Sequence, residues 1–292
     1  MFPRILLPIG LSVLGLALVI FCVYLFLIRT KRAHDKIAAY RGVNLAHRGL
    51  HGEGAAENSL SAFRRAVEAG FGVELDVRLS KDGELVVFHD DTLTRVAGVE
   101  GRVDELTLAE LRECRLLDTD DTIPTMREVF DLVDGRIPIL IEIKEKTGST
   151  AVTEKLLAEL KSYDGPYIVE SFNPMAISAF RKGRREVPVG ILSRRFCDMK
   201  EHKGSPLYFA LQNMLLNFLS TPDFVAYRHS DANTLSLKLA RSLFGTVTVA
   251  WTTRSAEEEK TAKKNGFDCI IFENYIPEDS RADVSKMPKF VN

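Results

Sequence analysis

Two short segments place charged side chains at the spacing of a β-strand. In 73–78 Glu74, Asp76 and Arg78 alternate with aliphatic residues, and in 139–144 Glu142 and Lys144 do the same. Because successive strand side chains point to opposite faces, the charged residues of each segment share one face. Carboxylates on a strand otherwise built for burial are unfavourable without a cation. We therefore expect Glu74, Asp76 and Glu142 to bind one divalent cation, calcium or magnesium, both of which prefer oxygen ligands. A solvated strand face with a salt bridge is the alternative.

Two histidines follow other apolar runs. His47 follows the run 43–46, and His89 follows the run 84–88. Histidine titrates near neutrality, so two imidazoles flanking a phosphate can act as general base and general acid. A lone histidine is more often structural than catalytic. Two histidines at the carboxyl ends of strands, where barrel active sites gather, favour a catalytic pair.

The elements that must position these residues alternate between strands and helices. Hydroxyl side chains at Ser59, Thr107, Thr125 and Ser255 mark helix starts, and the second and third begin capping boxes. Strand–helix alternation indicates a largely parallel sheet. The nine predicted strands are 43–46, 73–78, 84–88, 137–143, 167–169, 187–192, 224–227, 246–251 and 268–272.

Nine strands are one more than an eight-stranded barrel needs, and a hairpin explains the extra one. Asp82 and Gly83 form a strong turn signal that leaves no room for a crossover helix, so 84–88 must return antiparallel. A turn centred on these two residues places His89 opposite Asp76. The predicted fold is an α/β TIM-type (β/α)8 barrel with one hairpin and a small insertion at about 90–136.

The N-terminal segment has the composition of a transmembrane helix. From Ile5 to Ile28 there are 24 consecutive residues without a charge, enough to cross a ~30 Å hydrocarbon core. The run ends in a basic cluster, whereas a cleaved signal peptide would have a shorter apolar region and a small-residue cleavage site. We predict a transmembrane anchor at 1–29, a basic juxtamembrane linker at 30–42 and a catalytic barrel domain at 43–292.

The charge distribution predicts the orientation. Residues 1–41 contain six basic and one acidic residue and therefore carry +5, so the remainder of a chain of net charge −1 carries −6. The basic residues follow the apolar run, which predicts a single-pass membrane protein with its catalytic domain in the cytoplasm. We assume that this membrane is a bacterial cell membrane, which the charges themselves do not indicate. The bilayer is thus an expected partner, and a net-acidic domain gives no indication of nucleic-acid binding. Four widely separated cysteines indicate neither a zinc cluster nor a disulfide framework.

An ordered set of motifs closely resembles the glycerophosphodiester phosphodiesterase family over about residues 43–275. This resemblance implies a TIM-type barrel that hydrolyses glycerophosphodiesters to glycerol 3-phosphate and an alcohol. It implies that Glu74, Asp76 and Glu142 bind the metal and that His47 and His89 are the acid/base pair. It also implies that Arg48 and Lys144 bind the phosphate and that Trp251 contacts the glycerol or walls the pocket. The motifs are His47-Arg48-Gly49, Glu57-Asn58-Ser59, Glu74-Leu75-Asp76-Val77, Lys81-Asp82-Gly83, Val87-Phe88-His89-Asp90, Ile141-Glu142-Ile143-Lys144 and Val249-Ala250-Trp251-Thr252.

Two alternative functions remain open at this stage. A lysophospholipase D would cleave membrane lysophospholipids by the same chemistry, which suits an anchored enzyme. A catalytically inactive, membrane-tethered binding module would not need the three buried acids. The apolar segment 207–219 is interpreted as a helix that covers the barrel; the alternative is an interfacial helix that lies on the bilayer.

Overall fold

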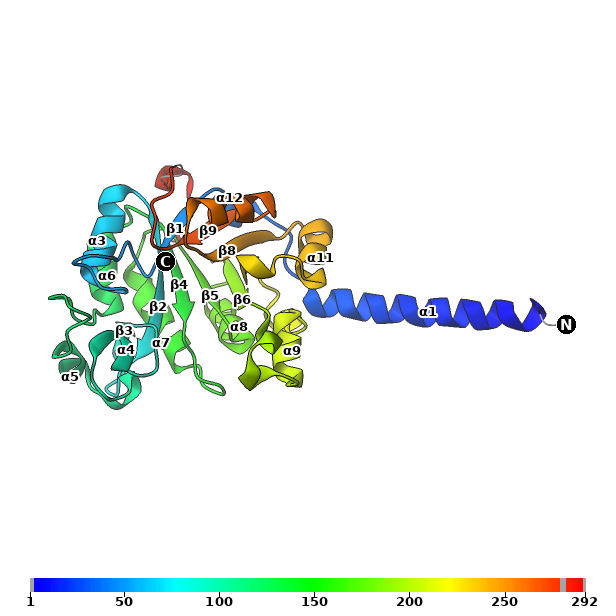
Figure 1. The fold of residues 1–292 in the computed structure, drawn as a ribbon, viewed down its shortest axis with the longest axis horizontal. Helices are drawn as coiled ribbons and strands as arrows, with labels where there is room; N and C mark the ends of the chain where they lie inside the picture. Colours follow the sequence, from blue (N-terminus) through cyan, green and yellow to red (C-terminus); the bar gives the residue numbers. More distant parts are fainter. Residues whose placement is uncertain (1–2, 279–281, 291–292) are drawn as a thin grey trace.

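The chain forms a closed barrel from which one long helix projects (Figure 1). The structure is a computed structural model that describes residues 3–278 and 282–290, with side chains from Gly10 onward. Within these residues eight parallel strands follow the order β1-β2-β4-β5-β6-β7-β8-β9, and β9 pairs with β1 to close the sheet. The predicted TIM-type barrel is confirmed, as are its nine strands.

The barrel strands are β1 (Asn44–His47), β2 (Gly72–Leu79), β4 (Ile139–Ile143), β5 (Tyr167–Ser171), β6 (Val189–Ser193), β7 (Phe224–Arg228), β8 (Val247–Thr253) and β9 (Cys269–Phe272), and β3 (Leu85–Val87) is the hairpin return. The helices are α1 (Pro3–Ile28), α2 (Asp35–Ala38), α3 (Leu60–Ala69), α4 (Thr94–Ala97), α5 (Leu108–Arg112), α6 (Met126–Val133), α7 (Ala151–Glu159), α8 (Pro174–Gly183), α9 (Pro206–Gln212), α10 (Asn217–Ser220), α11 (Leu235–Phe244) and α12 (Ala256–Lys264). Short 3-10 turns lie at η1 (Val103–Glu105), η2 (Leu160–Ser162), η3 (Phe196–Asp198), η4 (Lys200–His202), η5 (His229–Asp231) and η6 (Val284–Lys286).

The hairpin is present, but its predicted register is wrong by one residue. Phe88, not His89, lies opposite Asp76 and donates its backbone N–H to the Asp76 carbonyl at 2.9 Å. The cause is a three-residue loop, 81–83, in which Gly83 adopts the left-handed conformation at φ +82°. Since β3 ends at Val87, His89 lies beyond the ladder and strand alternation does not fix its direction.

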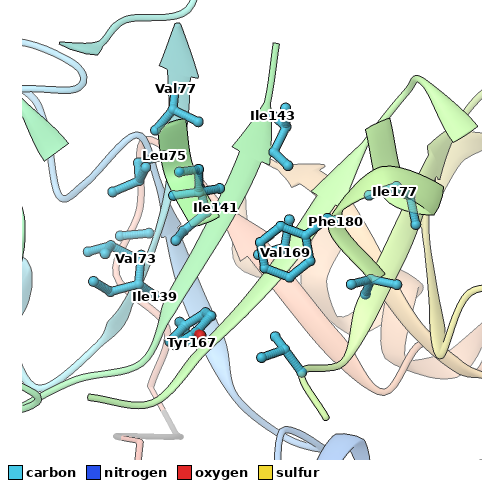
Figure 2. Packing of buried hydrophobic residues seen from close by; sticks show 14 of the residues in the cluster. Val73, Leu75, Val77, Ile139, Ile141, Ile143, Tyr167, Val169, Ile177 and Phe180 are labelled. Atoms are coloured by element: carbon cyan, nitrogen blue, oxygen red, sulfur yellow. The ribbon is translucent and has the colours of Figure 1, made fainter. Parts of the chain in front are cut away.

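Side chains alternate between the two faces of each barrel strand, which gives the barrel an apolar outer face distinct from its interior. Figure 2 shows the outward side chains of β2, β4 and β5 packed as one layer with Ile177 and Phe180 of α8. These outward residues are Val73, Leu75, Val77, Ile139, Ile141, Ile143, Tyr167 and Val169. The residues between them, including Glu74, Asp76 and Glu142, therefore point into the barrel.

The interior is filled in layers. The lower layer is apolar and contains Leu45, Leu140 and Ile168, and it is closed at the amino ends of the strands by Ile37 and Tyr40. Ile37 is 0% exposed and Tyr40 is 1% exposed, so the basic segment 30–42 is packed onto the barrel. The upper layer, at the carboxyl ends of the strands, holds the polar side chains, which is the position of the active site in this fold.

The region 90–136 divides into two parts. Helices α4 and α5 enclose a small core with Phe88 of the hairpin, including Val96, Leu111 and Ile123. Helix α6 instead packs on the barrel through Phe130 and its neighbours. All four predicted helix starts carry the expected side-chain cap, and both capping boxes are formed.

The apolar segment 207–219 is not one helix, as its composition suggested, but two. The helical conformation is interrupted near Met214, which has φ +56° and lies between α9 and α10. Met214 itself is buried, whereas Leu207 and Phe209 of α9 are 57% and 54% exposed. Among the described helices, α1 alone is long and apolar enough to cross a bilayer, and its segment Gly10–Ile28 has a mean hydropathy of 2.9 over 19 residues.

Candidate active site

Strand register brings four carboxylates and one histidine into the upper layer of the barrel. His47 on β1 pairs with Glu74 on β2, and Asp76 on β2 pairs with Glu142 on β4. Glu142 pairs in turn with Glu170 on β5. Because paired residues of neighbouring strands lie side by side on the same face, these groups line one continuous arc of the barrel mouth.

Glu74, Asp76 and Glu142 form a buried acidic cluster. One carboxylate oxygen from each lies within 4.8 Å of the others, and the three residues are 2%, 1% and 6% exposed. Burial raises the pKa of Glu74 well above its usual value and that of Glu142 to about 7. Three oxygen ligands converging out of contact with water fit a hard divalent cation, whose charge would hold all three carboxylates ionised.

Two basic side chains lie against this cluster. The Lys144 ammonium is 2.6 Å from Glu142 Oε1 and 3.0 Å from Asp76 Oδ1. The Arg48 guanidinium lies 3.5 Å from Asp76 Oδ2. Burial alone would raise the pKa of Asp76, but Lys144, His89 and Arg48 together hold it well below its usual value. The site therefore combines a cation cradle with two fixed positive charges suited to phosphate oxygens.

A left-handed turn after β1 orients Arg48. Arg48 has φ +56° and donates its backbone N–H to Glu74 Oε2 at 3.1 Å, while its side chain donates to Glu57 Oε1 at 2.7 Å. Gly49 follows with φ +81°, and a Cβ there would meet Ala62 Cβ at 2.8 Å. Only glycine fits this backbone and this close helix contact.

Asn58 orients the middle ligand of the cluster. Its Nδ2 donates to Asp76 Oδ2 at 2.9 Å, and its backbone N–H donates to the Arg48 carbonyl at 2.8 Å. Glu57 and Asn58 thus hold one basic and one acidic member of the site, and Ser59 caps the helix that supports both, by accepting from the Ala62 N–H.

Each histidine has its own carboxylate partner at Nδ1. His47 Nδ1 lies 3.0 Å from Glu273 Oε2, and His89 Nδ1 lies 2.6 Å from Asp90 Oδ1. A carboxylate at Nδ1 favours the tautomer that carries its proton there and leaves Nε2 as the reactive nitrogen. His47 Nε2 faces the cluster, 4.0 Å from Glu74 Oε2.

Burial keeps both imidazoles neutral near pH 7. It lowers the pKa of His47, although the hydrogen bond to Glu273 opposes the effect. It lowers the pKa of His89 to about 4, with Lys144 adding to the shift and Asp76 opposing it. The hydrogen bond from His47 lowers the pKa of Glu273 to about 2. A neutral imidazole beside an ionised carboxylate is ready to accept a proton.

The opposite wall of the site is apolar and aromatic. A pocket of about 280 Å³ is bounded on one side by the acidic cluster and the histidines and on the other by Trp251, Phe172 and Leu192. The Trp251 and Phe172 rings meet edge to face at 5.6 Å. Arg194 and Arg254 complete the rim.

The structure brings all eight predicted site residues to this pocket or into contact with its lining. Arg78, the third charged residue of its strand, turns away and donates to the His89 carbonyl at 2.9 Å. A second group in the described part of the chain, His47, His51 and Glu273, also has the spacing of a metal site. It is more exposed, and its His47 Nδ1 is already bonded to Glu273, so the acidic cluster fits a cation better.

Sequence reasoning missed three site residues: Glu170, Glu273 and Asp90. Glu170 is 1% exposed, and burial together with Glu142 and Glu74 raises its pKa well above the usual value. Glu170 lies within β5 and Glu273 directly follows β9, each at the position where the alternation that identified Glu74 and Asp76 points inward. Applying that rule to every strand would have found both.

Comparison with known proteins relates the chain to one family. Residues 47–276 match the model of the glycerophosphoryl diester phosphodiesterase family. A glycerophosphodiester phosphodiesterase of Caldanaerobacter subterraneus subsp. tengcongensis is 37% identical over 163 residues, which is 51% of this chain and 65% of that enzyme. A putative glycerophosphodiester phosphodiesterase of Bacillus subtilis, YhdW, is 28% identical over 81% of this chain and 97% of its own length.

Two further proteins extend the comparison. Human lysophospholipase D GDPD1 is 31% identical over 59% of this chain and 53% of its own length. The structure of an Oleispira antarctica phosphodiesterase in complex with sn-glycerol-3-phosphate superposes with a TM-score of 0.68 at 22% identity, covering 80% of this chain and 94% of that one. At that identity the superposition supports the barrel fold.

Proposed function

The chain belongs to the glycerophosphoryl diester phosphodiesterase family, and from this premise we propose that it hydrolyses glycerophosphodiesters to glycerol 3-phosphate and an alcohol. One observation carries the proposal. Strand register sets His47 beside Glu74 and Asp76 beside Glu142, so an acid/base group and a cation cradle share one pocket with His89. This combination suits cleavage of a phosphate ester.

In this proposal Glu74, Asp76 and Glu142 hold one divalent cation, calcium or magnesium. Their burial, mutual proximity and oxygen chemistry support the assignment. The bound cation would neutralise charge on the phosphate oxygens. Arg48 and Lys144, which contact the same carboxylates, would bind the remaining phosphate oxygens.

His47 and His89 would act as the acid/base pair. One neutral imidazole takes the proton from the nucleophile, either water or the neighbouring glycerol hydroxyl, at its Nε2. The other, whose pKa the bound phosphodiester anion would raise so that its Nε2 is protonated, gives that proton to the leaving alkoxide. Glu273 and Asp90 hold the two rings by their Nδ1 atoms. Each proton transfer typically contributes ~10²–10⁴-fold to the rate. Trp251 would pack against the glycerol or the alcohol group.

We also propose that α1 anchors the enzyme in a membrane. Residues 1–29 would form the anchor, 30–42 the basic juxtamembrane segment and 43–292 the catalytic domain. The basic residues that follow α1 favour a cytoplasmic catalytic domain. Segment 30–42 would then act as a packed connection rather than a flexible linker, since Ile37 and Tyr40 are buried in the barrel floor.

A second candidate activity is lysophospholipase D. Aromatic contacts support it, because Phe172 beside Trp251 contacts Phe196 at 5.8 Å and Phe196 contacts Tyr208 of α9 at 5.6 Å. This aromatic wall could receive an acyl chain. The intact set of buried acids opposes a catalytically inactive module, since unused buried carboxylates only destabilise the fold.

A side-by-side assay tests these alternatives. The full chain in mixed phospholipid vesicles is given glycerophosphocholine or lysophosphatidylcholine at matched concentrations, with and without calcium or magnesium. We expect cation-dependent release of glycerol 3-phosphate from the first substrate. Dominant release of lysophosphatidic acid from the second would favour the lysophospholipase instead. His47→Ala and His89→Ala should each nearly abolish turnover without altering the circular dichroism spectrum, and a variant that keeps most of its activity would contradict the assignment.

A further inference from the structure

The end of α1 is fastened to the side of the barrel. The Tyr24 hydroxyl is 2.7 Å from Ser236 Oγ at the start of α11, and the Phe26 ring contacts the Phe218 ring of α10, with 5.8 Å between the ring centroids. Below these contacts, Thr30 Oγ1 is 2.5 Å from Thr246 Oγ1 at the foot of β8. The projecting helix therefore leaves the barrel at a defined place and in a defined direction.

The direction follows from the two hydroxyl contacts. Helix α11 begins just after β7, at the catalytic end of the barrel, and ends just before β8, at the opposite end. Tyr24 is bonded to Ser236 near the beginning of α11, and Thr30 is bonded to Thr246 beyond the end of α11. Followed outward from Thr30, α1 thus runs toward the catalytic end of the barrel, and Figure 1 shows α9 and α11 as the barrel elements nearest to it.

The same contacts set the depth of α11 relative to a membrane. Tyr24 lies four residues before Ile28, the last residue of the apolar stretch Gly10–Ile28, or about 6 Å along the helix axis. If this stretch of about 28 Å spans a ~30 Å hydrocarbon core, Tyr24 lies within it. Ser236, bonded to Tyr24, must then lie at the membrane interface rather than in bulk water.

The surface at that depth is apolar. Leu235, Leu239 and Leu243 form a stripe at intervals of four residues along α11, and Leu219 of α10 lies beside Phe218. Leu235 is 62% exposed, Leu243 54% and Leu219 39%. We call Leu219, Leu235, Leu239 and Leu243 the apolar ridge. Residues 204–222 add a stretch without any charged side chain.

We propose that the apolar ridge lies in the lipid interface of the bilayer that α1 crosses, so that the catalytic end of the barrel is tilted toward the membrane. The proposal rests on the membrane anchor proposed above. Burial of exposed leucines in the acyl boundary is favourable, as for an interfacial helix. Exposed Arg32 and the Arg29 guanidinium, stacked 4.2 Å from the Phe26 ring, suit anionic headgroups at the same level.

Depth-dependent fluorescence quenching tests the proposal on the full chain in phosphatidylcholine–phosphatidylglycerol vesicles. An environment-sensitive fluorophore is attached to a single cysteine, and quenching by lipids with a shallow or a deep nitroxide is compared. Native Cys22, exposed within α1, reports on the anchor. Leu235→Cys and Leu243→Cys, made without the native cysteines, report on the apolar ridge. Glu113→Cys, exposed at the end of α5, is the matched control.

We expect strong quenching at Cys22 and quenching by the shallow nitroxide at Leu235→Cys. Quenching should be weaker at Leu243→Cys, which lies nearer the foot of β8, and at background level at Glu113→Cys. If the fluorophore at Cys22 is quenched and the one at Leu235→Cys is not, docking of the apolar ridge is overturned while the membrane anchor stands. Stronger quenching at Leu243→Cys than at Leu235→Cys would overturn the orientation. Unquenched Cys22 would overturn the anchor itself and docking with it. Unchanged hydrolysis of glycerophosphocholine shows that each labelled variant is folded.

Discussion

Glu273→Gln isolates the contribution to the reaction rate of a residue that contacts His47 but not the acidic cluster. The Glu273 carboxylate accepts from His47 Nδ1 at 3.0 Å, and neither side chain is more than 17% exposed. A hydrogen bond to a charged group contributes roughly 1.5–3 kcal/mol, which corresponds to about 10- to 150-fold in rate when the bond is lost in the transition state. Gln keeps the size but removes the charge and permits the wrong tautomer of His47.

The assay is steady-state hydrolysis of glycerophosphocholine by the full chain across a range of pH, with Glu278→Gln, exposed on the same C-terminal segment, as the control. We expect kcat to fall by about 10- to 150-fold with little change in KM. The sign of the pH effect is also fixed. Glu273 raises the pKa of His47, so the pH–rate limb that belongs to His47 should move to lower pH in the variant. An unchanged kcat and an unmoved limb would refute the positioning role.

Three further perturbations have defined outcomes. Asn58→Gly keeps the backbone φ of +55° but removes the amide that donates to Asp76, so the cation concentration needed for half-maximal activity should rise ~10- to 100-fold. Asp134→Gly, also at a residue of positive φ, is the control and should leave that concentration unchanged. We expect calcium or magnesium to raise the unfolding temperature of the parent, and Glu142→Gln, which removes one proposed carboxylate ligand, should abolish that rise. Asp223→Asn leaves Arg181, 2.8 Å away, without its buried partner and should destabilise the fold by about 3 kcal/mol in chemical denaturation at pH 7. Because Arg181, the Val189 N–H and His34 outweigh burial and lower the pKa of Asp223, this stabilisation is present above the unfolded pKa of ~3.9 and lost as pH falls below it. The difference from Asp223→Asn should vanish in acid.

Local rules sufficed for the part of the site that lies on single strands. The period of two in a strand is independent of what the strand pairs with, so Glu74 and Asp76 had to share a face. Their convergence with Glu142 required only that parallel strands start at similar levels, which the register of β2 and β4 satisfies. The helix caps were equally predictable, because a capping box is contained within four residues.

The rest depended on geometry that no local window contains. The hairpin register depends on one extra loop residue. A register shift of one residue moves every side chain of a strand to the opposite face of the sheet. Segment 30–42 was interpreted as a linker from its basic charge, but Ile37 and Tyr40 close the barrel floor through contacts with strands that come much later in the chain. Glu273 meets His47 only because β9 returns to pair with β1.

Barrel closure also divides the pocket by chemistry. The proposed metal ligands come from β2 and β4, with His47 at the end of β1, whereas Trp251, Phe172 and Leu192 come from or follow β8, β5 and β6. In the proposed binding mode, a phosphodiester held by the metal ligands and Arg48 would lay one of its ester groups over Trp251 and Phe172. The aromatic contacts continue from Phe172 through Phe196 to α9, which lies on the flank where α1 leaves the barrel. If the phosphate binds at the acidic cluster and α1 crosses a membrane, as we propose, the substrate group that lies over Trp251 is the one nearest the membrane.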